Sequence, residues 1–147
     1  MNVVQDSWNF VSFRKNPDAV IESGVSGSGG RFTLCSGLVF YNRAAECCAV
    51  SHYTSSPNAH KGFWEWLKGG IDPGSTLLVI KSYLASTPMS RYFTSAIDHV
   101  TAQSDSRVIK CREGVGTGER TISAGIRCNS TGWTLYKGGV AEDPIRW

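Results

Sequence analysis

The spacing of apolar residues predicts β-strands at both ends of the chain and two helices between them. Two segments, 31–41 and 46–53, have strand-like patterns and are joined by four residues, a length typical of a hairpin. Segment 76–83 is apolar and β-branched without alternation, which predicts a buried strand. Further short strands are expected at 8–13, 19–21, 107–112, 121–128 and 133–137.

The two predicted helices each have an apolar face to bury. Ser56 followed by Pro57 is typical of a helix start, and a glycine pair further along ends that helix. Ser90 is expected to cap the second helix. The order of elements predicts an α+β fold, with a mixed sheet or β-sandwich core and two helices packed on one face. We expect residues 1–147 to form a single domain.

The composition is that of a folded chain without a strong charge. Of 147 residues, 41% are hydrophobic and 18% are charged, which excludes intrinsic disorder. The net charge is +3, so a nucleic-acid partner is not indicated. No apolar run exceeds four residues, so membrane insertion is not expected. The first residues lack the pattern of a signal peptide, so synthesis in the cytoplasm is expected, and delivery to a target cell without a cleavable signal stays open.

The five cysteines argue against a disulfide framework. Their number is odd, and Cys47 and Cys48 are adjacent. There is no Cys-x-x-Cys pair, so no metal site is predicted, and no organic cofactor is expected. Cys48, Cys111 and Cys128 are interpreted as small buried side chains. Cys35 differs because it follows a Gly/Ser-rich segment, whose backbone N–H groups can stabilise a thiolate or an oxyanion.

Cys35 and His52 form the candidate catalytic pair. A nucleophilic cysteine needs a nearby base, which is usually a histidine. The predicted hairpin brings Cys35, at the start of one strand, beside His52, 17 residues later and near the end of the next strand. Because alternate residues share a face, Cys35 is placed with Gly37, and His52 is placed with Val50. The other two histidines, His60 and His99, are interpreted as surface or core-edge side chains.

The residues around this pair resemble a known active site. Segments 33–41 (TLCSGLVFY) and 48–52 (CAVSH) are similar to the active-site hairpin of the bacterial chemoreceptor glutamine deamidases, the CheD family. The resemblance covers residues 31–137 and extends to the cytotoxic necrotizing factor and Burkholderia lethal factor deamidase toxins. It implies that Cys35 is the nucleophile, that His52 is the base, and that a hydroxyl before the cysteine orients the histidine. The candidates for that third catalytic residue are Thr33 and Ser28, with a backbone carbonyl as an alternative.

The resemblance implies a cysteine hydrolase that deamidates surface glutamines of a partner protein, in a chemoreceptor-type or a toxin-type setting. Transglutamination differs only in whether an amine replaces water, so it and other cysteine hydrolase activities stay open. A different class is a non-catalytic protein-binding module on the same fold, with large aromatic residues as its surface. The residues considered for that surface are Trp64, Trp66, Trp133 and Trp147, with core packing as the alternative for Trp66 and Trp133. The oligomeric state is not predicted.

Overall fold

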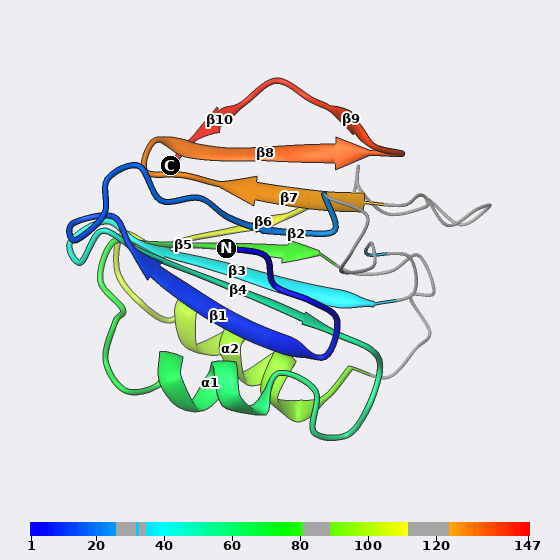
Figure 1. Cartoon of the computed structure of the whole chain (residues 1–147). Coiled ribbons are helices and arrows are strands. Elements are labelled where there is room, and N and C mark those ends of the chain that lie inside the picture. Colours follow the sequence, from blue (N-terminus) through cyan, green and yellow to red (C-terminus); the bar gives the residue numbers. More distant parts are fainter. Residues whose placement is uncertain (26–31, 33–34, 81–88, 112–123) are drawn as a thin grey trace.

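A computed structural model describes residues 1–25, 32, 35–80, 89–111 and 124–147, which contain two helices and ten strands (Figure 1). The first sheet contains β1 (Ser7–Ser12), β3 (Ser36–Asn42), β4 (Cys47–Tyr53), β5 (Ser75–Ile80) and β6 (Arg107–Lys110). The second sheet contains β2 (Ile21–Ser23), β7 (Ala124–Cys128), β8 (Gly132–Lys137), β9 (Val140–Ala141) and β10 (Ile145–Arg146). The helices are α1 (Lys61–Leu67) and α2 (Arg91–Thr101).

The first sheet has the order β1-β4-β3-β5-β6. Its strands pair antiparallel except β5 and β6, which are parallel because the chain returns through α2 between them. The central strands β3 and β5 are buried along their whole length. This burial explains their nearly continuous apolar sequences, since a strand covered on both faces has no need to alternate. The predicted pairing of the two hairpin strands, β3 and β4, is confirmed.

The chain is arranged in three layers (Figure 1). The helices cover one face of the first sheet, and the second sheet, with the order β10-β8-β7-β2, covers the other. Two apolar cores result, one between the sheets and one between the first sheet and the helices. The predicted α+β fold, with two helices on one face of a sandwich, is therefore found. Neither helix in the described ranges has the length and apolar character needed to span a bilayer.

One helix starts where the sequence predicts, and the other does not. Ser90 is the N-cap of α2, and its Oγ accepts a hydrogen bond from the backbone N–H of Phe93 at 3.2 Å. The predicted start of α1 at Ser56 is wrong, because residues 56–60 form turns and the N-cap is His60, in the left-handed region with φ 65°. The Ser-Pro signal marks the turn that leads into the helix instead of its first residue.

The predicted strands are found, with shifted bounds. The second strand, expected at 19–21, runs from Ile21 to Ser23, and the strand expected at 31–41 begins at Ser36. Parts of the expected strands 31–41, 76–83 and 121–128 lie outside the described residues. The two-residue strands β9 and β10 were not expected, since pairs of exposed residues are too short to give a periodic pattern.

The tryptophans differ in burial: one lies in the core, and others are partly buried. Trp133 is 3% exposed in the core between the sheets, as the core-packing alternative expects. Trp66 packs against the core under the helices and stacks on Phe10, with ring centroids 5.3 Å apart. Trp147 stacks on Tyr41 at 4.4 Å.

Candidate active site

The hairpin of β3 and β4 positions the candidate pair at one end of the sandwich. His52 lies directly opposite Gly37 in the strand register, and Cys35 lies two residues before Gly37, immediately ahead of β3. Because alternate residues share a face, Cys35 and His52 both lie on the face toward the second sheet. The sequence predicts only that the hairpin brings the two residues together, and the register adds that they lie on one face. Cys35 is 5% exposed, and His52 is fully buried.

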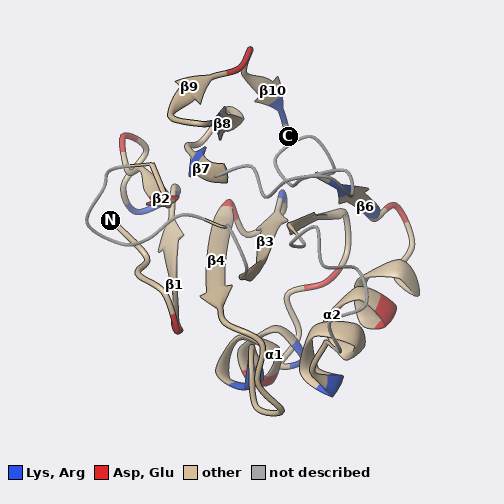
Figure 2. Cartoon of the chain, turned by 90° about the vertical axis from the view of Figure 1, so that its right-hand side faces the viewer, with Lys and Arg blue, Asp and Glu red and all other residues tan. Residues whose placement is uncertain are grey.

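The strands that carry the pair have no charged residues. No Lys, Arg, Asp or Glu occurs in β3, β4 or β5, and the charged residues lie around these strands (Figure 2). His52 therefore lies in a largely apolar part of the sheet, where the uncharged form of an imidazole is favoured.

Ser23 fixes the proton position on His52. The Ser23 hydroxyl donates to the backbone carbonyl of Val3 at 2.6 Å and lies 2.9 Å from Nδ1 of His52. A serine hydroxyl has one proton to donate, so Nδ1 must carry a hydrogen and donate it to Ser23 Oγ. The other ring nitrogen, Nε2, is then left with a lone pair. This is the tautomer that a general base requires.

The lone pair at Nε2 has no hydrogen-bond partner in the described part of the chain, although the atom is buried. One face of the imidazole is covered by the ring of Phe32, with centroids 3.8 Å apart and planes 22° apart. Gly37 makes room for that ring, because a Cβ at this position would lie 2.4 Å from a Phe32 ring carbon. The absence of a side chain at Gly37 is thus a packing requirement of the site.

Burial determines the charge of His52. It lowers the pKa of the imidazole from 6.5 to about 4, because a charged ring would lose its hydration. The carboxylate of Asp6 acts in the opposite direction and is outweighed. Asp6 accepts hydrogen bonds from the backbone and hydroxyl of Thr54 at 2.9 and 2.7 Å, and these bonds lower its own pKa. His52 is therefore a neutral proton acceptor at pH 7.

His60 occupies the opposite face of the same sheet. Its Nδ1 lies 2.9 Å from Ser51 Oγ and its Nε2 lies 2.8 Å from Ser36 Oγ. Ser51 donates to the carbonyl of Leu38 at 3.2 Å, so Nδ1 donates to Ser51, and Nε2 accepts from Ser36. The predicted surface or core-edge position is wrong, since His60 is fully buried. The error follows from the wrongly predicted helix start. His60 ends the turn that leads into α1, and its side chain is buried between the helix and the sheet.

Burial also lowers the pKa of His60, to about 3, and His52 lowers it further by charge repulsion. Both nitrogens are occupied, so this histidine links the start of α1 to β3 and β4 and leaves no lone pair for a reaction. His99 agrees better with its predicted position, since it is partly exposed on α2 with its ring 5.4 Å from that of Trp64.

The hydroxyl that contacts Nδ1 of His52 was not predicted. Thr33 and Ser28 lie outside the described residues, so neither can be compared with the expectation. Ser23, in β2 of the second sheet, is the hydroxyl that the structure places on Nδ1 of His52. Nothing local in the sequence marks it, because the contact arises from the packing of one sheet on the other.

The other cysteines lie in apolar cores. None of the five cysteines forms a disulfide. Burial raises the pKa of Cys47, and it raises that of Cys48 strongly, with a hydrogen bond to Cys128 adding to the effect. In the described ranges, no group of three or more potential metal ligands is present.

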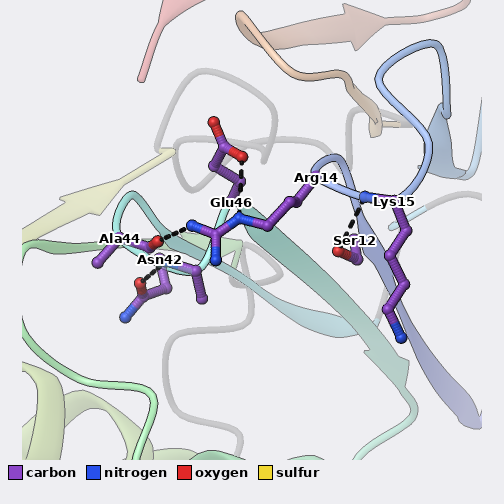
Figure 3. A network of polar contacts seen from close by, with 7 residues as sticks. Ser12, Arg14, Lys15, Asn42, Ala44 and Glu46 are labelled. Carbon is purple, nitrogen blue, oxygen red and sulfur yellow. Dashed lines mark hydrogen bonds and ion pairs between the residues drawn. The ribbon is translucent and has the colours of Figure 1, made fainter.

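A small cavity lies at the other end of the hairpin. It has a volume of about 220 Å³ and is lined by Phe13, Arg14, Pro17, Tyr41, Glu46 and Ser130. The Arg14 guanidinium donates to the carbonyl of Ala44 at 2.6 Å and pairs with Glu46 at 3.4 Å, which fastens the turn between β3 and β4 (Figure 3). Both side chains of this ion pair are exposed, so it contributes little stability.

Neither a protein-family model nor a curated protein matches this sequence. The assignment of chemistry therefore depends on the residues of the site.

Proposed function

We propose that the protein is a cysteine hydrolase that deamidates glutamine side chains of a partner protein, with Cys35 as nucleophile and His52 as base. The observation that supports this most is the state of His52. Its tautomer is fixed by Ser23, its buried Nε2 has no hydrogen-bond partner among the described residues, and Cys35 lies on the same face of the hairpin. A buried nitrogen without a partner is costly. Nε2 of His99 is in the same state within the described residues, so it is the shared face with Cys35 that favours a role in proton transfer for His52.

The proposed reaction begins with proton transfer from the Cys35 thiol to Nε2 of His52. The sulfur bonds to the carboxamide carbon of glutamine, and the carbonyl oxygen becomes negative. Nε2–H then protonates the leaving nitrogen, the C–N bond breaks, and ammonia departs to leave a thioester. In the second half, water gives a proton to Nε2 and its oxygen to the thioester carbon. The C–S bond breaks, Nε2–H returns its proton to the departing sulfur so that the thiol is restored, and glutamate remains.

Ser23 is a positioning residue in this scheme. By accepting from Nδ1–H, its hydroxyl keeps the lone pair on Nε2 and steadies the ring when it becomes an imidazolium. It has no contact with the substrate in the proposed reaction. Its removal is therefore expected to weaken catalysis, whereas loss of Cys35 or His52 is expected to abolish it.

The test is ammonia release combined with intact-protein mass spectrometry. The probes are the cytoplasmic domain of a chemoreceptor, which the family resemblance implies, and casein as an unrelated glutamine-containing protein. We expect the substrate mass to rise by about 1 Da per deamidated glutamine, with loss of this activity in Cys35→Ser. Cys47→Ser is the matched control, because Cys47 is a buried thiol on the opposite face of β4.

Addition of methylamine separates hydrolysis from amine transfer. A deamidase leaves glutamate, whereas a transglutaminase adds the amine and raises the mass by about 13 Da more than water does. Ammonia release that persists in Cys35→Ser would show that this cysteine is not the nucleophile. A lack of release from every probe, with an unreactive Cys35 thiol, would favour the binding-module alternative.

A further inference from the structure

Phe32 is held between the two sheets, directly against the proposed base. Its backbone N–H donates to the carbonyl of Ala124 at 2.9 Å, and its carbonyl accepts from the Ala124 N–H at 3.3 Å. These bonds attach Phe32 to the first residue of β7, while its fully buried ring stacks on His52. Ser23, the partner of Nδ1, also belongs to the second sheet. The second sheet thus provides Ser23 and anchors Phe32 through an isolated bridge, so both groups that hold the imidazole of His52 depend on it.

The position of the ring depends on Gly37 as well. A Cβ at Gly37 would lie 2.4 and 2.8 Å from two ring carbons of Phe32. Contacts this short do not occur, so any side chain at this position must push the ring away from its place over His52. The stack of Phe32 on His52 can therefore be disturbed in two ways. One is to remove the ring of Phe32, and the other is to add a side chain at Gly37, which fills the space that the ring occupies.

We propose that the ring of Phe32 holds His52 in its uncharged form, and that displacement of the ring from the imidazole lets His52 take the proton of the Cys35 thiol. This inference rests on the proposed function of that pair. Thiolate formation requires the proton to move to Nε2, and the resulting imidazolium is unfavourable while an apolar ring replaces water on its face. A displaced ring admits water or a substrate amide to that face, which stabilises the charged pair.

The other groups near His52 do not account for this restraint. Asp6, ahead of β1, favours a charged ring and therefore acts against the uncharged form. Ser23 is uncharged and accepts from Nδ1 in either charge state of the ring. Besides Asp6, the titratable groups placed near His52 in the described residues are Cys35, on the same face of the hairpin, and His60, on the opposite face of the sheet.

Two variants test the stack, and one controls for general loosening of the core. Phe32→Ala removes the ring, and Gly37→Ala keeps the ring but displaces it. Because emptying a core position can prevent folding, Gly37→Ala tests the same contact with the aromatic residue retained. Phe93→Ala is the matched control, since the ring of Phe93 lies 5.2 Å from that of His60 on the other side of the sheet.

The readouts are the pKa of His52 from its ring nitrogen shifts in NMR spectra and the rate of Cys35 alkylation by iodoacetamide at pH 7. In both site variants we expect the pKa of His52 to rise by about one unit and alkylation to accelerate about tenfold. Phe93→Ala should change neither. An unchanged His52 pKa in folded Phe32→Ala or Gly37→Ala would overturn the inference, and so would an equal change in Phe93→Ala.

The measurements distinguish failure of the deamidase assignment from failure of the role of Phe32. If the His52 pKa and the alkylation rate change as expected while the wild-type protein releases no ammonia from any probe, the role of Phe32 stands and the deamidase assignment fails. If wild-type protein releases ammonia but the variants leave the His52 pKa unchanged, the deamidase assignment stands and the role of Phe32 fails.

Discussion

His52 and His60 are both fully buried and lie on opposite faces of the same hairpin, but they differ in one hydrogen bond. Both nitrogens of His60 are bound by serine hydroxyls, whereas Nε2 of His52 has no partner in the described residues. The strand period explains why the two histidines lie on opposite faces. Cys35, on the face of His52, and Ser36, which binds His60, are adjacent and must face opposite sides. Burial alone therefore does not identify a reactive histidine. The open lone pair distinguishes the candidate base from the structural cross-link.

The two histidines also differ in the free-energy cost of their burial. Leaving a buried polar atom without a partner costs about 1–3 kcal/mol, whereas the bonds of His60 offset its desolvation. The cost at His52 is consistent with a group kept for chemistry. The predictions below separate the two histidines by activity, acid sensitivity and stability.

The largest expected effect is on activity. In His52→Gln, ammonia release should fall by about a thousandfold, because the amide keeps much of the side-chain volume but cannot accept the thiol proton. Ammonia release is measured beside urea unfolding, so that loss of fold is recognised. The double variant with Cys35→Ser should be no less active than Cys35→Ser alone, since the pair acts as a unit. Additive losses would contradict the assignment.

The second prediction concerns acid. The folded pKa values of about 4 and about 3 lie below the unfolded value of 6.5, so between these values the unfolded chain binds protons that the folded chain does not. The stability that both neutral rings provide is complete above pH 6.5 and is lost as the pH falls through 4. By pH 4 each histidine should account for about 3 kcal/mol of lost stability. Urea unfolding at several pH values measures this.

The His52→Gln variant provides the control for that titration. It should lose less stability between pH 6.5 and 4 than the wild-type protein, because one titrating ring is gone. Equal slopes for the two proteins would show that the burial of His52 does not determine its protonation.

The third prediction removes the structural cross-link. In His60→Ala, unfolding free energy should fall by about 2–3 kcal/mol, because a cavity forms and the Ser36 and Ser51 hydroxyls lose their partner. The folded fraction should still release ammonia, since His60 faces away from Cys35. His99→Ala is the control, with a smaller loss expected from its partly exposed position. Activity lost as completely as in His52→Gln would show that the two faces are coupled in the reaction.

The smallest expected effect is that of Ser23→Ala. Without this hydroxyl, Nδ1–H loses its acceptor and the ring can adopt the other tautomer, so ammonia release should fall about tenfold. Stability should fall by about 1 kcal/mol. Ser23→Thr, which keeps a hydroxyl, should restore part of the activity, as measured in the same assay. If both variants are fully active, Ser23 does not set the tautomer.

The features that the sequence predicts are those that depend on neighbours along the chain. The hairpin that brings Cys35 and His52 together follows from the strand period, and the start of α2 follows from the capping of Ser90. The burial of His60 could not be predicted, because a single residue at the start of a helix gives no periodic pattern. The contact of Ser23 with His52 depends on how the two sheets pack, and local sequence contains no signal for it.

The pairing of β2 has a consequence for the order in which the molecule is assembled. Ile21 of β2 pairs with Cys128 of β7, and Phe32 is bridged to Ala124, so the groups that hold His52 are fixed by residues synthesised late. The hairpin of β3 and β4 joins neighbouring segments and can close early during synthesis, whereas pairing across roughly a hundred residues is slow. A nascent chain that ends before β7 would thus contain Cys35, His52, Ser23 and Phe32, but Ser23 and Phe32 would lack the strand with which they pair. Emergence of the last strands from the ribosome would complete the site.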